Sequence, residues 1–322
     1  MNNIFLSLLN IETASEIKYQ DYIEKFKQKR NYDEDPLYWL FKDNEGNLSQ
    51  FHNVDLQKKI NLKHSDIPVF RKLHSDILLE LLSTSNIFPK VIDILCYCHE
   101  TIENSHSILP VLKAKKKIGL KSSLPFSIGH AGSLNSAIAI ELAIALLNGN
   151  YENFLLTIVD SVIPPFSRFS FNGYIKGDGA TSILLNKNKG DYKVKDVKIY
   201  PSSLNKDLSN WGIEEYLESE KLIIAKYKDL LDDINSSKNS VKFVLYQNLS
   251  NKVDGKLEEI NSNISLNTIK RLRYAEVNLL GSDIFYSLKE LEEKNILVAG
   301  DVILLVSASI DHGIAGIVLE KT

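Results

Sequence analysis

Near-continuous apolar runs of strand length recur along the last two-thirds of the chain. They lie at residues 91–98, 154–162, 241–249, 301–309 and 313–320, and a tight glycine turn within 174–186 leads into a further strand. Such runs predict strands that are buried on both faces, as in a sheet covered by helices on each side. The alternation of these runs with helical patterns places the chain in the α/β class.

Segments with helical periodicity lie between and before these runs. Residues 133–147 are apolar on nearly every face, which predicts a central, buried helix that ends at the Asn-Gly-Asn of 148–150. Residues 282–294 predict a second helix of the later part. In the first 90 residues, the periodicity predicts amphipathic helices over 16–30 and 68–85, the second with Ile77, Leu78, Leu81 and Leu82 on its buried side.

The order of these elements occurs twice. A strand, a buried helix, another strand and an adjacent strand appear in the first half and again after residue 240. This indicates an internally duplicated α/β domain with its functional region where the halves meet. Residues 187–240 are charged and lack a clear pattern, so we expect an insertion or a lid-like connection there.

Composition narrows the function classes. The 322 residues carry a formal net charge of −3, and they contain one dense basic cluster, Lys113–Lys117. The negative net charge and the lack of a longer basic stripe argue against nucleic-acid binding. No apolar run reaches the length of a membrane helix, and the first residues make a poor signal peptide. The two cysteines, Cys96 and Cys98, are too few for a disulfide framework or a Cys-based zinc site, so we expect a cytoplasmic protein without a metal.

Three stretches together resemble the type III β-ketoacyl-acyl carrier protein synthases, which have the thiolase fold. They are the turn and helix of 118–162, Arg168 with "KGDGATSILL" at 176–185, and the hairpin of 300–320. The resemblance covers about residues 88–322. It implies two duplicated halves in a five-layered α-β-α-β-α sandwich, with an N-terminal half at 1–187, of which 1–90 diverge, and a C-terminal half at 188–322.

The resemblance also implies three catalytic positions. The family's nucleophilic Cys falls on Gly132, which has no side chain to hold an acyl group. Its His falls on Tyr246, a poor base at neutral pH, and its Asn falls on Asn278, which is either retained or an ordinary loop residue. The family's consecutive glycines near the C-terminus are replaced by 309–313, which include Asp311.

Two nearby side chains offer substitutes for the missing groups. Ser133 is a possible nucleophile and His130 a possible base, but the favoured interpretations are a helix N-cap for Ser133 and a structural role for His130. The sequence names no third, orienting carboxylate; its candidates are Asp160, Asp178, Asp283 and Asp311.

The favoured hypothesis is therefore a β-ketoacyl synthase III-like protein of acyl-transfer or secondary-metabolite biosynthesis, acting as a catalytically degenerate subunit. It would form a homo- or heterodimer with a thiolase-fold partner, through the strand at 154–162. Coenzyme A or carrier-protein phosphopantetheine would supply the thioester handle, and an acyl carrier protein would meet the basic residues near 113–121. The alternatives are an active acyltransferase that uses Ser133 or His130, and an acyl-thioester-binding module.

Overall fold

A computed structural model describes most of the chain. The described residues are 3–12, 14–18, 66–70, 72–85, 91–101, 109–162, 168, 173–204, 212–237 and 239–322. Most of the expected helix at 16–30 lies outside them, and its first residues, 16–18, belong to a short strand.

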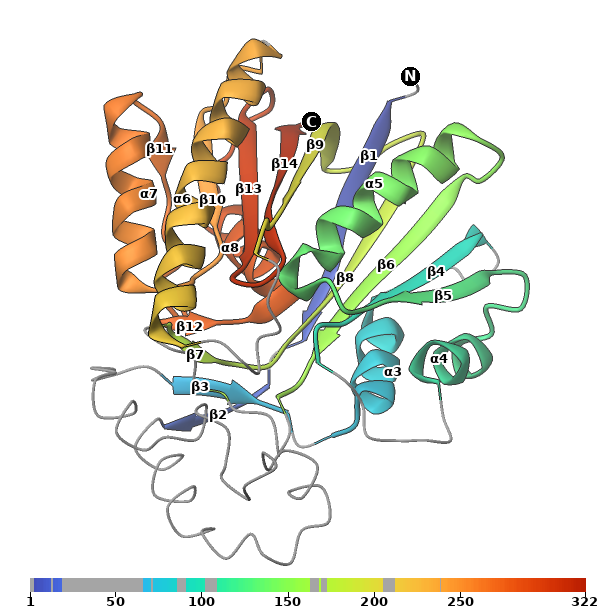
Figure 1. Ribbon diagram of the computed structural model, residues 1–322. Helices are drawn as coiled ribbons and strands as arrows, with labels where there is room; N and C mark the ends of the chain where they lie inside the picture. The colour runs from blue at the N-terminus through green and yellow to red at the C-terminus, as the bar shows by residue number, and fades with distance from the viewer. Residues whose placement is uncertain are drawn as a thin grey trace, which may run out of the picture.

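One large sheet runs through the molecule (Figure 1). Its strand order is β11-β10-β13-β14-β9-β1-β8-β6-β4-β5. The strands are β1 Ile4–Glu12, β4 Ile94–Cys98, β5 Leu124–Ile128, β6 Asn153–Asp160, β8 Gly179–Asn186, β9 Tyr192–Pro201, β10 Phe243–Tyr246, β11 Asn267–Thr268, β13 Val302–Ser309 and β14 Gly313–Lys321. Two short pairs stand apart: β2 Ser15–Lys18 with β3 Asp66–Val69, and β7 Ile175–Lys176 with β12 Val277–Asn278.

The same order occurs in each half of the sheet. Counted along the chain, the strands of each half lie in the order first, fifth, fourth, second, third, starting from β1 in one half and from β9 in the other. The antiparallel pairing of β1 with β9 joins the halves. A division of the chain at 187/188 falls between β8 and β9 and stays a prediction.

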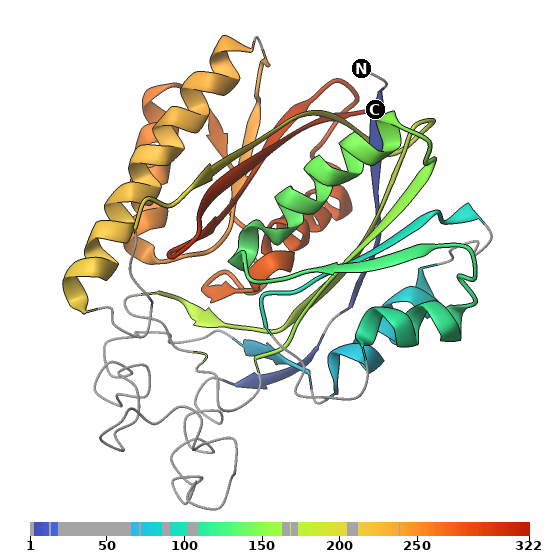
Figure 2. The ribbon, with the colours of Figure 1, turned by 45° about the vertical axis from the view of Figure 1, so that its right-hand side comes forward.

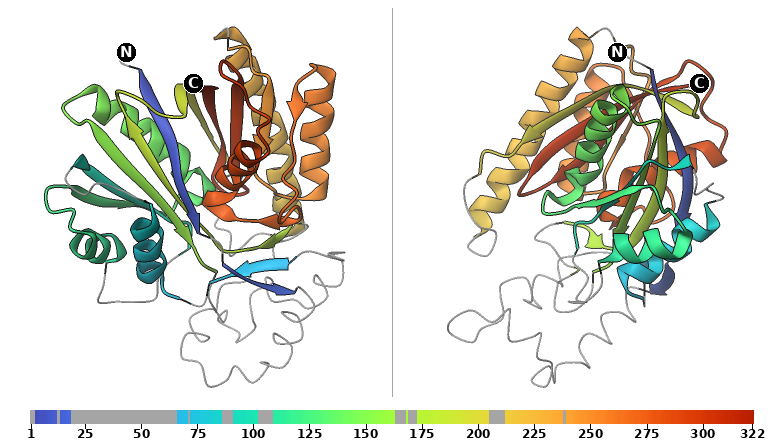
Figure 3. Two further views of the ribbon diagram at one scale, coloured as in Figure 1. Left: turned by 180° about the vertical axis from the view of Figure 1, so that it is seen from behind. Right: turned by 90° about the vertical axis from the view of Figure 1, so that its right-hand side faces the viewer.

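Helices fill three layers around the two half-sheets. The central layer holds α5 Asn135–Asn148 and α8 Asp283–Glu293, which Figure 2 shows lying together between the half-sheets. The outer layers hold α3 His74–Thr84 with α4 Pro110–Ile118 on one side, and α6 Ile213–Ser236 with α7 Asn251–Asn263 on the other (Figure 3). The fold is thus the expected thiolase-like α-β-α-β-α sandwich.

The alternation of side chains along a strand produces these layers. On β4, the buried Ile94, Cys96 and Cys98 pack with residues of α5 and α8, whereas Leu95 and Tyr97 pack with residues of α3 and α4. A strand that serves two cores has no polar face, which is why β4 appears in the sequence as an unbroken apolar run. The predicted burial of Ile77, Leu78, Leu81 and Leu82 on α3 is confirmed.

Two expectations from the sequence are wrong. Residues 187–240 are no insertion, because β9 lies inside the sheet between β14 and β1 and α6 covers the second half-sheet. The charged residues of β9 interrupt the continuous apolar run by which the other strands were recognised. Residues 1–90 include β1, which lies at the junction of the halves, and their divergence from the family stays a prediction. Finally, the strand at 154–162 has no free edge, because β6 pairs with both β4 and β8; the edge strand of that half is β5.

Candidate active site

The carboxyl ends of parallel strands from both halves converge on one region. In the first half β4, β5 and β6 are parallel, and in the second half β10 and β13 are parallel. Residues that directly follow such strands meet at one edge of the sheet, where ligands bind in many α/β proteins. Glu100 follows β4, Ser133 follows β5 and Gln247 follows β10, and these three side chains are in contact.

Ser133 is the central member of this group. It lies in a short 3₁₀ turn, η5 Gly132–Leu134, immediately before α5, and it is 2% exposed. Its Oγ donates to Glu100 Oε2 at 2.8 Å and accepts from Gln247 Nε2 at 2.9 Å. α5 has no side-chain N-cap, so the hydroxyl faces the site and not the helix backbone.

Gln247 connects the two halves of the site. Its Nε2 donates to Ser133 Oγ and, at 2.9 Å, to Asn278 Oδ1. Its Oε1 accepts from the backbone N–H of Ala308 at 3.1 Å, which fixes the orientation of the amide. A glutamine here can polarise a carbonyl oxygen as a hydrogen-bond donor, but it neither accepts nor releases a proton at neutral pH.

The structure does not place Tyr246 in this group. Its hydroxyl donates to the backbone carbonyl of Asp254 at 3.3 Å, and its ring packs in the core under α6 and α7. Because successive residues of an extended chain point in opposite directions, Gln247 faces the site and Tyr246 faces away. The residue in contact with Ser133 is thus one position later than expected.

Asn278, in contrast, lies in the group. Its Oδ1 accepts from Gln247 and, at 2.8 Å, from the backbone N–H of Leu280. The pairing of β12 with β7 sets Asn278 opposite Lys176, whose Nζ lies 3.8 Å from a Glu100 oxygen. A continuous series of hydrogen bonds therefore runs from Glu100 through Ser133 and Gln247 to Asn278.

Gly132 lies beside this series. It has a φ of +53°, and a Cβ added to it would stand 2.3 Å from Ser309 Oγ and 2.8 Å from Ser309 Cβ. Ser309 therefore occupies the space that a side chain at 132 would need. Only glycine fits this backbone conformation together with this neighbour.

His130 does not pair with Ser133. It is exposed and has a φ of 61°. Its backbone carbonyl accepts from His312 Nε2 at 2.8 Å, and no hydrogen bond joins its ring to Ser133 within the described residues. Its backbone thus has a structural role, in the contact between its own turn and the β13–β14 hairpin.

The turn of that hairpin carries a second polar cluster. Ser309 Oγ donates to Asp311 Oδ1 at 2.6 Å, and His312 Nδ1 lies 2.7 Å from the same oxygen. His312 is the residue that contacts the His130 carbonyl, so the cluster holds the hairpin against the turn of η5. Asp311 is engaged by its own hairpin and not by Ser133.

The other expected carboxylates are buried and hold backbone. Asp178 forms a bidentate pair with Arg168 at 2.6 and 3.0 Å, and Asp283 pairs with Arg271. Burial raises the pKa of Asp160 to about 7, and the nearby Glu100 carboxylate adds to this effect. None of these carboxylates contacts Ser133, and the carboxylate that does is Glu100.

The two thiols lie near the head of α5 and yet are inaccessible. Cys96 and Cys98 are 0% exposed, with their Sγ atoms 3.9 Å apart. Burial raises the pKa of the Cys98 thiol far above its usual range, and its Sγ contacts the backbone carbonyl of Asn135 at 3.6 Å. A buried thiol with a raised pKa is inert, as expected for a core residue.

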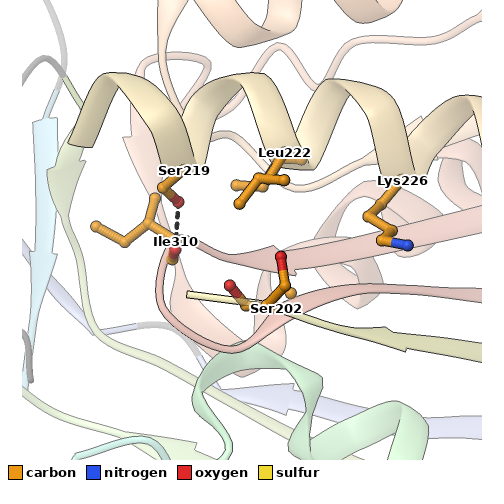
Figure 4. Close-up of a pocket in the computed structure, with 8 residues that line it drawn as sticks. Ser202, Ser219, Leu222, Lys226 and Ile310 are labelled. Atoms are coloured by element: carbon orange, nitrogen blue, oxygen red, sulfur yellow. Dashed lines mark hydrogen bonds between the residues drawn. The ribbon is translucent and has the colours of Figure 1, made fainter. Parts of the chain in front are cut away.

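A shallow hollow lies on another side of the hairpin. Figure 4 shows it between α6 and the hairpin turn, with Ser202, Ser219, Leu222 and Lys226 around it. The Ser219 hydroxyl donates to the Ile310 carbonyl there. No side chain of the series from Glu100 to Asn278 lines this hollow.

Neither a metal site nor a membrane-spanning helix occurs among the described residues. They contain no cluster of three or more His, Cys, Asp or Glu that could hold a metal ion. They also contain no helix that is both long enough and apolar enough to cross a membrane.

Sequence reasoning missed Glu100 and Gln247. A usable signal existed for each, since a polar residue that comes within two positions after a buried parallel strand belongs to the ligand-binding edge of the sheet. Glu100 has this position after β4 and Gln247 after β10.

No protein-family model and no curated protein matches the sequence. Solved structures match over nearly the whole length. The acyltransferase ChlB3 is 15% identical with a TM-score of 0.71, over 99% of this chain and 98% of that one. A variant of OleA from Xanthomonas campestris is 13% identical with a TM-score of 0.69, again over 99% and 98%. A 3-oxoacyl-(acyl-carrier-protein) synthase III is 12% identical with a TM-score of 0.69, over 98% and 99%.

At these identities the similarity establishes the fold, which is that of the thiolase-like condensing enzymes. Function depends on the site and not on the fold.

Proposed function

We propose that this chain is a β-ketoacyl synthase III-like protein of acyl-transfer biosynthesis that acts as a catalytically degenerate subunit beside an active partner of the same fold. The observation that carries the proposal is the amide of Gln247 at the centre of the site, bonded to Ser133 and Asn278. A condensing centre needs a nucleophile that holds the acyl group and a group that moves protons. An amide supplies neither.

The surroundings of Gly132 support the same proposal. By the resemblance, the family's nucleophile would fall on this residue, and Ser309 fills the space that a side chain here would need. The hydroxyl of Ser133 donates to Glu100 and accepts from Gln247, so the amide of Gln247 occupies one of the two lone pairs of the oxygen. The accepted hydrogen bond lowers the nucleophilicity of this oxygen.

An exposed sheet edge supports the pairing. Within the described residues β5 pairs with β4 on one side only, and Leu124 at its start is 49% exposed. An uncovered edge presents free N–H and C=O groups to another chain. We propose that the partner, a second copy or an active thiolase-fold protein, adds its own edge strand here.

The thioester handle of the shared substrate would be coenzyme A or carrier-protein phosphopantetheine. An acidic carrier protein would meet the C-terminal end of α4, where Lys115, Lys116 and Lys117 follow one another. Exposed lysines at a helix end attract acidic partners through long-range charge.

Intact-protein mass spectrometry after incubation with acetyl-coenzyme A tests the proposal. We expect no acyl adduct on this chain alone, and an adduct on the partner when the chain is co-expressed with a thiolase-fold protein encoded next to its gene. A stable adduct on Ser133 would overturn the degenerate-subunit proposal. Thioester binding without turnover and without a partner would instead favour the binding module.

One contact favours the alternative of an active acyltransferase. The Ser133 hydroxyl donates to the Glu100 carboxylate at 2.8 Å, an arrangement in which Glu100 could receive the proton as Ser133 attacks a thioester. The O–C bond would form, the C–S bond would break, and the thiol would leave with the proton. In this case Ser133→Ala and Glu100→Gln would each abolish release of thiol, whereas His130→Ala would leave it intact.

A further inference from the structure

Asp160 ends β6 and is completely buried, and loops from both halves of the molecule bind to its carboxylate. Oδ1 accepts from the backbone N–H groups of Glu100 at 2.6 Å and of Thr101 at 3.0 Å. Oδ2 accepts from the backbone N–H of Gly281 at 3.2 Å. The first two groups belong to the loop after β4, and the third belongs to η7 Leu280–Ser282, directly after Asn278 and Leu279.

We propose that Asp160 is a positioning residue of the site: by binding both loops, it holds the Glu100 carboxylate against Ser133 and sets that pair relative to Asn278. The inference uses the site on which the proposed function rests, but not the activity proposed for it.

The surroundings of Asp160 indicate that its role is to hold backbone and not to form an ion pair. Within the described residues no Lys, Arg or His forms a salt bridge with it. A buried carboxylate is costly unless hydrogen bonds replace its water, and here backbone N–H groups do so. The residue at 281 is glycine, and a Cβ there would stand 3.2 Å from Asp160 Oδ2 and 3.1 Å from Ile158 Cγ2. The absence of a side chain lets the turn approach the carboxylate.

A second network fixes the same loop from the outer layer. Thr101 Oγ1 donates to Asp160 Oδ1 at 3.2 Å and lies 3.2 Å from His74 Nε2. His74 Nδ1 lies 2.6 Å from the Tyr97 hydroxyl. Burial lowers the pKa of His74 to about 4, so at neutral pH its ring is uncharged and serves both neighbours as a hydrogen-bond partner. The loop after β4 is thereby held at Thr101 as well as at Glu100.

The charge state of Asp160 sets how strongly its carboxylate holds the two loops. Its pKa is about 7, raised by burial first and by the Glu100 carboxylate second, and lowered by the three N–H groups. The other titratable groups that face it are the Cys98 thiol on β4 and, through Thr101, His74 on α3. Ionised Asp160 binds the N–H groups more strongly than neutral Asp160 does.

A reporter thiol at position 133 tests the placement of Glu100 without any substrate. In Ser133→Cys, the introduced thiol stands beside the Glu100 carboxylate, and this negative charge disfavours the thiolate. The ultraviolet absorbance of the thiolate, measured against the parent protein, gives the pH midpoint of its ionisation. Cys96 and Cys98 are present in both proteins and cancel.

A double-mutant cycle separates positioning from direct charge. In the Ser133→Cys background, Glu100→Gln is expected to lower the midpoint by about one pH unit, because the neighbouring negative charge is removed. Asp160→Asn is expected to lower it by a similar amount, because the amide oxygen cannot hold both loops. If Asp160 acts through Glu100, the two changes together give no more than Glu100→Gln alone. The matched control is Asp93→Asn, since Asp93 Oδ2 also accepts two backbone N–H groups, those of Glu152 and Asn153, away from the site.

The outcomes decide the proposal. Non-additive shifts with an unchanged Asp93→Asn control support it. An unchanged midpoint in Asp160→Asn, additive shifts, or no effect of Glu100→Gln would each overturn it. If Asp160→Asn does not fold, Gly281→Ala presses on the same carboxylate from the other half, and an unchanged midpoint there has the same meaning. Because the reporter needs neither thioester nor partner, a failure here is distinct from a failure of the proposed function.

Discussion

Alanine at position 132 tests whether Ser309 leaves room for a side chain at this residue. The residue is in the left-handed region, with a φ of +53°, and an added Cβ would overlap Ser309. A side chain in the left-handed region costs about 1–2 kcal/mol. Overpacking a tight site adds about 1–3 kcal/mol. We therefore expect Gly132→Ala to lower the free energy of unfolding by about 2–5 kcal/mol.

Two further variants separate these contributions. Gly119 also has a positive φ, +81°, but a Cβ there would have no neighbour within 4 Å. Gly119→Ala therefore reports the backbone cost alone, about 1–2 kcal/mol. Ser309→Gly removes both atoms that a Cβ at 132 would strike, so adding it to Gly132→Ala should recover the overpacking part and leave the backbone part.

Urea unfolding followed by circular dichroism gives these free energies when the slopes of the transitions agree. The reasoning is refuted if Gly132→Ala costs no more than Gly119→Ala, or if Ser309→Gly relieves nothing in the double variant. Either result would mean that a side chain, and with it a thiol, fits at position 132.

Three other predictions follow from buried charges and from the surface of α4. Burial raises the pKa of Asp254 from 3.8 to about 7, so the contribution of its protonated form to stability is complete below pH 4 and is lost as the pH rises to about 7. Between these pH values the free energy of unfolding of the parent protein should fall by an amount on the order of 4 kcal/mol, and Asp254→Asn should not show this fall. Arg271→Met leaves the buried Asp283 unpaired and should cost about 3–5 kcal/mol in urea unfolding, whereas Arg273→Met, which breaks an exposed pair with Glu16, should cost less than about 1 kcal/mol; equal losses would contradict this. Lys115→Glu with Lys116→Glu should weaken binding of an acidic acyl carrier protein in calorimetry at low salt, and the opposite change, Glu141→Lys, should not; unchanged affinity would remove α4 as the contact.

The strands of the core could be predicted because the burial of each position is reflected in an apolar residue at that position. A strand covered on both faces is apolar at nearly every residue, so β4, β6, β10, β13 and β14 are visible one by one in the sequence. β9 and α6 were not, because charged residues occupy the faces that they turn to solvent. The period of such an element can be recognised only when it is known which of its faces packs against the core. Which face does so depends on the neighbouring elements.

The site divides in the same way. Ser133 was named as a candidate from its place before the buried helix α5, and Asn278 from the resemblance to the family. Gln247 was missed in favour of its neighbour Tyr246, because the sequence does not show where the strand ends and therefore which of the two side chains faces the site.

By itself the sequence determined the α/β class, the duplicated order of strands, the lack of a side chain at position 132 and the burial of both thiols. Only the tertiary structure decided that Glu100 reaches Ser133, that Gln247 joins Ser133 to Asn278, and that Ser309 fills the space beside Gly132. Local burial and glycine are properties of one position and its near neighbours. Contacts between residues 33 or 114 positions apart depend on how the loops of two half-sheets meet, and no local pattern encodes that meeting.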